Sequence, residues 1–229
     1  MGKKLARNFY LREDTITVAR DLLGKLLVVP DENGERVSAM VVEAEAYCGI
    51  DDKAAHSYGG RRTPRNEVMY GMGGHAYVFF VYGMYHQFNV VTGPPERPHA
   101  ILIRAVEPVE GIEIIRERRH KRSEPGATAK HWPRFARPEP TGSSADNNLT
   151  SGPGKLCIAL AINRDLNGEN LRGNRVWLED HHTFPNDEIA VGKRIGIDYA
   201  GEDADRPWRY WVRSNAFVSK PRLEISSEN

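Results

Sequence analysis

The stretch that decides the fold reads Gly74-His-Ala-Tyr-Val-Phe-Phe-Val-Tyr-Gly-Met-Tyr-His-Gln-Phe-Asn-Val90. It holds three of the chain's nine Tyr residues and three of its seven Phe residues. Side chains typical of strands alternate on both sides of Tyr82-Gly83-Met84-Tyr85, and a glycine at the first position of a two-residue loop suits a tight turn. We therefore expect a β-hairpin with a two-residue loop at Gly83 and Met84.

The expected tip of this hairpin carries Tyr82, Met84 and Tyr85. Hairpin tips normally carry Asn, Asp, Ser or Lys because they face water. Large apolar groups held on a stiff ribbon instead indicate insertion into a partner. The base stack of a duplex is one such partner.

Outward from the hairpin, short strands are mixed with a few helices and show no regular βαβ alternation, which indicates an α+β fold. We expect one domain over 1–229, with a mixed, mostly antiparallel sheet, flanking helices and a protruding hairpin. Residues 120–148 are rich in Pro and poor in large aliphatic side chains, so they predict a mobile loop. The predicted elements are a helix between Asp14 as N-cap and Gly24, helices over 108–119 and 156–162, and strands over 25–29, 36–47, 100–104, 176–178, 194–197 and 208–212.

The charges nearly cancel, with 32 Lys and Arg against 31 Asp and Glu, which gives no support to indiscriminate nucleic-acid binding. Any site for a polyanion must be local. Basic clusters occur at Lys3-Lys4, at Arg61-Arg62 with Arg65, and over 116–122, but each fits a solvated surface equally well. Ser151-Gly-Pro-Gly-Lys155 opens a predicted helix, where an anion site and a simple helix start are both compatible with the pattern.

The chain has only two Cys residues, and none of its eight His residues shows metal-ligand spacing. We expect no disulfide framework, no metal and no cofactor. The chain also has no signal-peptide pattern and no apolar run of membrane-spanning length. We therefore expect an intracellular monomer without a membrane partner, in the cytoplasm or nucleoid of a bacterium or the nucleus of a eukaryote.

Glu43, Glu45 and Tyr47 are spaced to share one face of a strand, at roughly 6–7 Å per step. Two carboxylates at this spacing fit an acid and a base with room for water between them. The alternative is a structural pair, with one Glu buried beside an Arg and the other exposed. Spacing alone does not choose between the carboxylates.

Tyr47, Tyr77, Phe79 and His56 supply flat surfaces that suit a planar ring. Stacking of this kind is worth roughly 1–3 kcal/mol per base, comparable to the few kcal/mol needed to unstack a base from a duplex. An ordinary aromatic core is the alternative, but it leaves the tip of the hairpin unexplained.

Six short blocks stand out along the chain: Glu43-Ala-Glu45-Ala-Tyr47, Ala54-Ala-His56-Ser, Thr63-Pro-Arg65-Asn, Val81-Tyr-Gly-Met-Tyr85, Arg104-Ala-Val-Glu-Pro108 and Ser151-Gly-Pro-Gly-Lys-Leu-Cys157. In this order, over roughly residues 8 to 220, they resemble the alkyladenine (3-methyladenine) DNA glycosylases.

The resemblance implies a monofunctional glycosylase that flips alkylated or deaminated purines from duplex DNA and hydrolyses the N-glycosidic bond. It assigns Glu45 as general base, with Arg104 near the catalytic water and Glu43 in support. Phe79 stands where the family often has Tyr, which removes a hydroxyl from the pocket and leaves the range of bases open. The remaining implied roles are the base pocket (Tyr47, His56, Phe79, Asn89 and Tyr77), the minor-groove wedge (Tyr82, Met84 and Tyr85) and phosphate contacts (Thr63, Arg65 and Lys155).

Two other classes of function remain as alternatives. A non-catalytic damage sensor would use the same hairpin without producing abasic sites. A small glycoside or nucleoside hydrolase would use Glu43 and Glu45 on free substrates, without duplex DNA.

Overall fold

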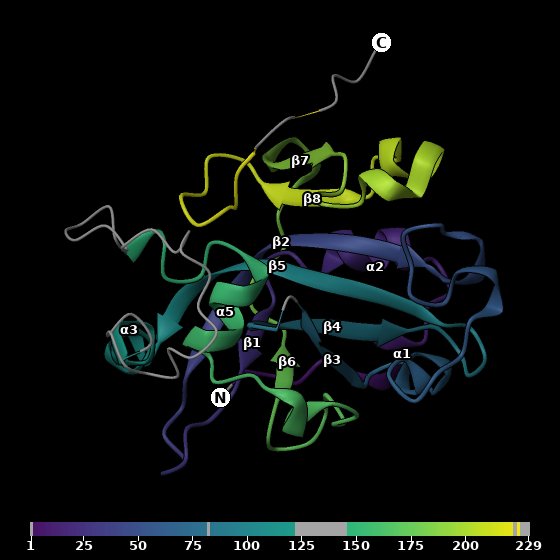
Figure 1. Ribbon diagram of the computed structural model, residues 1–229. Coiled ribbons are helices and arrows are strands. Elements are labelled where there is room, and N and C mark those ends of the chain that lie inside the picture. The colour runs from purple at the N-terminus through teal and green to yellow at the C-terminus, as the bar shows by residue number, and fades with distance from the viewer. Residues whose placement is uncertain (1, 82, 122–145, 222–223, 225–229) are drawn as a thin grey trace.

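The computed structural model describes residues 2–81, 83–121, 146–221 and 224 (Figure 1). Its strands are β1 Leu26–Val28, β2 Ser38–Cys48, β3 Ala76–Val81, β4 Tyr85–Thr92, β5 His99–Glu110, β6 Trp177–Glu179, β7 Ile189–Gly192 and β8 Arg209–Val212. Its α-helices are α1 Arg7–Tyr10, α2 Thr15–Asp21, α3 Ile112–Lys121 and α5 Pro153–Ala159. Short 3-10 helices cover Gly49–Asp51, Tyr58–Gly60, Glu67–Tyr70, Arg164–Leu166, Asn186–Glu188 and Asp198–Asp205.

The strands form one sheet in the order β3-β4-β5-β2-β1-β6, and β8 pairs with both β2 and β7. The strand pairs between described residues are antiparallel. In Figure 1, α2 is seen behind β2, which it contacts, and α5 packs on β4 and β5. The α+β fold predicted from the sequence is confirmed.

The two long central strands, β2 and β5, contribute buried side chains to the hydrophobic core. Ala44 and Ala46 of β2 and Ile101 and Ile103 of β5 are fully buried in the main apolar cluster. At roughly 25 cal/mol per Å² of apolar surface, such burial is the main term that stabilises the sheet. The helix over 15–21 begins as predicted, because the Asp14 side chain accepts a hydrogen bond from the Thr17 N–H.

The aromatic stretch forms the expected hairpin, but with a different loop. Val81 pairs with Tyr85, so three residues separate the strands, and the prediction of a two-residue loop was wrong. Gly83 has a φ of 68°, and the Met84 N–H donates to the Val81 carbonyl at 3.1 Å. Alternation of side chains does not fix the register of a turn, which depends on these backbone details. Tyr82 lies outside the described residues.

Near its turn, the hairpin extends past the rest of the sheet. β4 pairs with β5 only through residues 89–92. The half closer to the turn packs against α5, and a Cβ on Gly154 would lie 2.8 Å from Tyr85 Cδ1. The Tyr85 ring is therefore half-buried on the backbone at the start of α5, which only glycine allows it to approach so closely.

Other element boundaries differ from the predictions. The helix expected from residue 108 begins at Ile112, because β5 continues through Pro108 to Glu110. Pro108 lies opposite Ala39 beside a register shift, where a missing N–H is tolerated. The helix expected over 156–162 instead runs from Pro153 to Ala159, with Pro153 in the first turn.

Two further predictions concern residues 194–197 and 120–148. The prediction of a strand over 194–197 was wrong. The strand in this region is Ile189–Gly192, and residues 194–197 form an irregular segment in which Gly196 has a φ of 76°. The mobile loop predicted over 120–148 falls mostly on residues 122–145, which lie outside the described residues. Residues 120 and 121 end α3 instead.

Candidate active site

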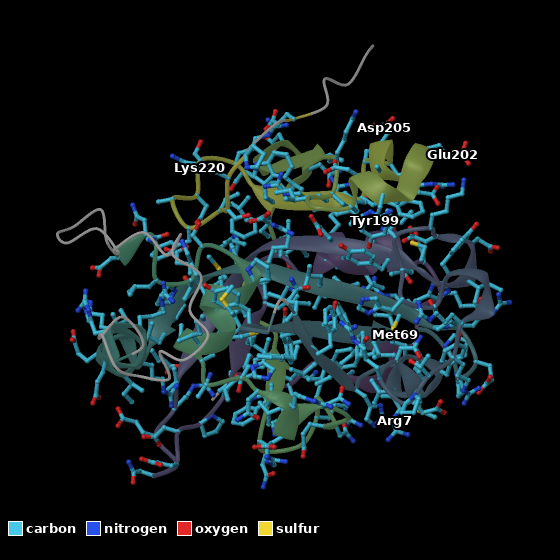
Figure 2. The ribbon with its side chains drawn as sticks, in the orientation of Figure 1. Arg7, Met69, Tyr199, Glu202, Asp205 and Lys220 are labelled. Atoms are coloured by element: carbon cyan, nitrogen blue, oxygen red, sulfur yellow. The ribbon has the colours of Figure 1, made fainter. Side chains whose placement is uncertain are left out.

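A cavity of about 190 Å³ opens where the hairpin, β2, β5 and the segment after β7 meet. The two lining residues labelled in Figure 2, Met69 and Tyr199, come from segments that are far apart in the sequence. The full lining is Tyr47, Ala54, His56, Met69, Tyr77, Phe79, Val81, Gln87, Asn89, Ala100, Leu102, Arg104, Ile195, Gly196, Ile197 and Tyr199.

One face of the hairpin forms a wall of this cavity. Tyr77 lies opposite Asn89 in the ladder, and Phe79 lies opposite Gln87. These four side chains line the cavity because directly paired residues and residues two apart share a face of the sheet. The Asn89 side-chain amide donates to the Tyr77 carbonyl at 3.1 Å, which fixes its orientation.

The aromatic residues of the site pack at angles rather than in a flat stack. The rings of His56 and Phe79 lie 4.6 Å apart at 73°, and those of Tyr77 and Phe79 lie 5.0 Å apart. Tyr77 and Phe79 also belong to a small apolar cluster with Met69. The aromatic-core alternative is thus correct for their packing, but the same residues line the cavity.

His56 is held as a neutral imidazole. Its Nδ1 lies 2.8 Å from the Tyr77 hydroxyl. Burial and, after it, the positive charges of Arg65 and Arg61 together lower the pKa of His56 to about 4. Burial raises the pKa of Tyr77 to about 12. This pair therefore forms a neutral hydrogen bond near pH 7.

The three predicted phosphate contacts lie at the edge of the site or outside it. The Arg65 guanidinium sits 4.9 Å from the centroid of the Phe79 ring, so it lies against the aromatic wall. The Thr63 N–H and hydroxyl both donate to the Asn66 side chain, at 2.7 and 2.9 Å. Lys155 is hydrogen-bonded to Asn148 and is not among the residues that line the cavity.

Glu43 is buried, and donors surround both of its oxygens. Oε1 accepts from Arg104 Nε at 3.0 Å, Arg209 Nε at 2.7 Å and the Ser219 hydroxyl at 2.9 Å. Oε2 accepts from the Ser219 N–H at 2.7 Å. Such saturation is typical of a structural carboxylate.

Glu45 is equally buried, so the alternative in which one carboxylate is exposed is wrong. Its Oε1 accepts from the Ile195 N–H at 2.8 Å and lies 3.3 Å from Arg104 Nη1. Its Oε2 accepts from the Tyr47 hydroxyl at 2.9 Å. Glu45 itself does not line the cavity, but Ile195, Arg104 and Tyr47 all do. The carboxylate therefore lies directly behind this part of the wall.

Burial and the charge of Glu45 both affect the pKa of two neighbouring side chains, Arg104 and Tyr47, which is raised in each. Burial acts to lower the pKa of Arg104, but Glu45 and Glu43 outweigh it, and the pKa is raised. Burial, and then the charge of Glu45, raise the pKa of Tyr47 well above its ordinary value. Tyr47 therefore remains a neutral donor to the carboxylate.

A buried ion pair supports Tyr47 from behind. Arg194 binds both oxygens of Asp52, at 2.6 and 2.9 Å, and neither side chain is exposed. The Arg194 guanidinium lies 4.8 Å from the centroid of the Tyr47 ring and 4.9 Å from that of Trp208. A planar guanidinium stacks well on aromatic faces, so it holds the Tyr47 ring in place.

Sequence reasoning missed several residues of the site. Ile195 acts through its backbone N–H, which no side-chain pattern reveals. Arg194 was assigned to a strand, and Gln87 was read only as part of the hairpin. Tyr199, 74% exposed, lies at the cavity with no neighbouring motif to mark it.

Within the described ranges, His, Cys, Asp and Glu side chains do not gather into a group that could hold a metal ion. Every helix in the same ranges is too short or too polar to span a bilayer.

Known proteins resemble this chain over most of its length. A family model described as methylpurine-DNA glycosylase matches residues 8–216. A protein of Desulfitobacterium hafniense (strain Y51) is 49% identical over 217 residues, which cover 95% of this chain and 98% of that protein. A protein of Clostridium acetobutylicum is 47% identical over 218 residues, which cover 94% and 97%. Both carry the name "Putative 3-methyladenine DNA glycosylase". The chain belongs to the methylpurine-DNA glycosylase family, whose members are hydrolases that act on N-glycosyl bonds.

Proposed function

We propose that the protein flips an alkylated or deaminated purine out of duplex DNA into this cavity and hydrolyses its N-glycosidic bond with water. The product is an abasic site, and the strand is not cleaved. The single observation that carries the proposal is the difference between the two carboxylates. Glu43 is saturated by four donors, whereas the three partners of Glu45 all line the cavity.

In this proposal Glu45 accepts the proton of the attacking water and stabilises the positive charge that develops on the sugar. Arg104 orients the carboxylate and the water. Tyr47 lies against one face of the base, with His56 and Phe79 toward the other. Removing a general base of this kind lowers a rate by roughly 10²–10⁴-fold.

The leaving group determines how much further help the reaction needs. 3-Methyladenine already carries positive charge, so it departs without a strong acid. A neutral base such as hypoxanthine requires protonation. His56 is a poor donor of that proton near pH 7, because its pKa is about 4. Asn89, fixed against the Tyr77 carbonyl, would crowd the exocyclic amine of guanine.

The hairpin turn supplies the contact with the duplex. Tyr82 would fill the gap left by the flipped nucleotide, and Met84 and Tyr85 would press on neighbouring base steps. Thr63, Arg65 and Lys155 would contact phosphates. Replacing Tyr82 by Ser should weaken binding to a lesion-bearing duplex. Equal binding by both proteins to a duplex with an abasic analogue would rule out the wedge.

The proposal is tested by incubating the protein with duplexes that carry 3-methyladenine, hypoxanthine or ethenoadenine, and then cleaving abasic sites with alkali. Strand breaks should require both the enzyme and alkali. Glu45→Gln should abolish them, whereas Glu35→Gln, the same change on an exposed turn residue, should not. Tight binding without abasic sites would indicate a damage sensor. Turnover of free nucleosides without turnover of duplexes would indicate a small glycoside hydrolase.

A further inference from the structure

Gln87 occupies a prominent place in the cavity. It lies on β4 directly opposite Phe79, and both side chains line the cavity. It is half-buried. Among the residues that the structure describes, no hydrogen-bond partner is found for its side-chain amide.

Two other polar side chains on this side of the cavity each make a hydrogen bond within the protein. The Asn89 amide donates to the Tyr77 carbonyl, and the Tyr77 hydroxyl is hydrogen-bonded to His56. Across the cavity, the Tyr47 hydroxyl donates to Glu45. Among the described residues of the hairpin wall, Gln87 therefore presents an amide whose donor and acceptor are both open to a ligand.

The position of Gln87 is significant because its cross-strand partner is Phe79. A phenylalanine ring offers a stacking surface but no hydrogen bond. A half-buried amide that gains no partner on binding loses hydration without compensation. A ligand that fills the cavity therefore binds well only if it offers Gln87 a partner.

The chemistry of the amide defines that partner. A glutamine side chain places an N–H donor and a carbonyl acceptor side by side. It pairs with an edge that offers an acceptor beside a donor, as an adenine edge does. 3-Methyladenine keeps its exocyclic amine next to ring nitrogens, and hypoxanthine has an N–H next to a carbonyl. Ethenoadenine has its exocyclic nitrogen closed into a ring, so this edge offers acceptors only.

We propose that Gln87 is a specificity-determining residue that binds the edge of the flipped base through a paired hydrogen bond. It favours damaged purines that retain a donor and an acceptor side by side over those that have lost the donor. This inference rests on the proposed function and goes on to specify its substrate class.

The test compares single-turnover release of 3-methyladenine, hypoxanthine and ethenoadenine by the wild type, Gln87→Leu and Gln87→Glu. Leu has a similar size and no polar group, and Glu retains an acceptor but loses the donor. The control is His86→Leu on the same strand, whose ring packs 4.9 Å from that of Phe80 rather than in the cavity.

Gln87→Leu should slow release of 3-methyladenine and hypoxanthine about tenfold relative to ethenoadenine, as for the loss of one paired contact to a base. Gln87→Glu should give a smaller change, and His86→Leu should keep the wild-type ratios. Ratios within one protein preparation are insensitive to partial misfolding.

The inference is overturned if Gln87→Leu slows release of all three bases in the same proportion, or of none. An equal loss would place Gln87 on the sugar or the backbone. A wild type that releases none of the bases would contradict the proposed function itself. An active wild type with unchanged ratios in Gln87→Leu would contradict the role of Gln87 alone.

Discussion

The two buried glutamates of β2 should respond in opposite ways to the same substitution. In Glu43→Gln, the carbonyl can replace Oε1 and continue to accept from Arg104, Arg209 and the Ser219 hydroxyl. The new NH₂ group then faces the Ser219 N–H across the 2.7 Å now bridged by Oε2. The flipped orientation is worse, because it turns the NH₂ group toward two guanidinium donors.

The expected cost in Glu43→Gln follows from these contacts. One buried donor is left unsatisfied, which costs about 1–3 kcal/mol. Two buried guanidiniums also lose their shared counter-charge, and breaking a buried ion pair from one side costs about 3–5 kcal/mol. The two figures overlap, so we expect the free energy of unfolding to fall by about 3–5 kcal/mol.

Glu45→Gln should be far milder for stability. A carbonyl at the Oε1 position keeps the bonds from the Ile195 N–H and Arg104. The NH₂ group then faces the Tyr47 hydroxyl, which can rotate and accept instead of donating. Every hydrogen-bond partner is retained and Arg104 keeps the counter-charge of Glu43, so the expected loss is about 1 kcal/mol. Base release should nevertheless fall by at least about 10²-fold, because an amide is not a general base.

Urea titrations followed by circular dichroism, together with single-turnover excision of hypoxanthine, measure both quantities on the same variants. Glu35→Gln, in the exposed turn over 31–35, is the control that should change neither quantity. The reasoning is refuted if Glu43→Gln is as stable as the wild type, or if Glu45→Gln releases base at a near-normal rate. Loss of excision by Glu43→Gln in a fully folded protein would also contradict the division of roles.

Three further changes test other parts of the site. The pKa of His56 is about 4 in the folded protein, against an ordinary value of 6.5. Between pH 6.5 and 4 the unfolded chain therefore binds a proton at His56 that the folded protein does not bind. The free energy of unfolding thus decreases as the pH falls through this window. His56→Gln should therefore flatten the fall in urea stability over this range, by up to roughly 1.4 kcal/mol per pH unit before solvent screening; parallel curves would contradict this. In Asp52→Asn, Arg194 loses its counter-charge behind Tyr47. The free energy of unfolding should therefore fall by about 3 kcal/mol, and binding to lesion-bearing duplexes should weaken. Unchanged urea stability and duplex affinity would show that the Asp52–Arg194 pair does not support the Tyr47 ring. Tyr82→Ser should weaken duplex binding in gel-shift titrations and leave the midpoint of urea unfolding unchanged. A shifted midpoint would show that Tyr82 stabilises the folded protein.

The sequence predicts secondary structure well where the conformation depends on neighbouring residues in the chain. Asp14 caps its helix, and the alternation around Phe79 gives a hairpin whose inner face lines the site. Turn geometry is less visible, and the loop proved one residue longer than predicted. Pro108 was misleading because proline is compatible with both a first helical turn and the irregular end of a strand.

The sequence indicates which side chains form the candidate site. It does not indicate which groups bind those side chains. Glu45, Tyr47 and Arg104 are brought together as expected. The Ile195 N–H and the Arg194 pair come from a segment about 150 positions away, and their contribution depends on tertiary contacts that leave no local pattern. Near-zero net charge was equally uninformative, because it averages over clusters such as the one that contains Arg65.

A pair of irregularities in the ladder between β2 and β5 explains how one arginine reaches both carboxylates. The register pairs Glu43 with Ala105 and Ala44 with Ile103, so Arg104 is left without a partner in the ladder. Bulges of this kind re-aim a side chain and are common beside active sites. Arg104 contacts Glu43 through Nε and Glu45 through Nη1, which links the saturated carboxylate to the one behind the cavity wall. In the proposed mechanism, Glu43 supports the reaction only by holding Arg104 in place, through a contact that the carbonyl of Glu43→Gln would keep. A Lys at position 104, a point charge without the planar fork, could not serve both carboxylates at once.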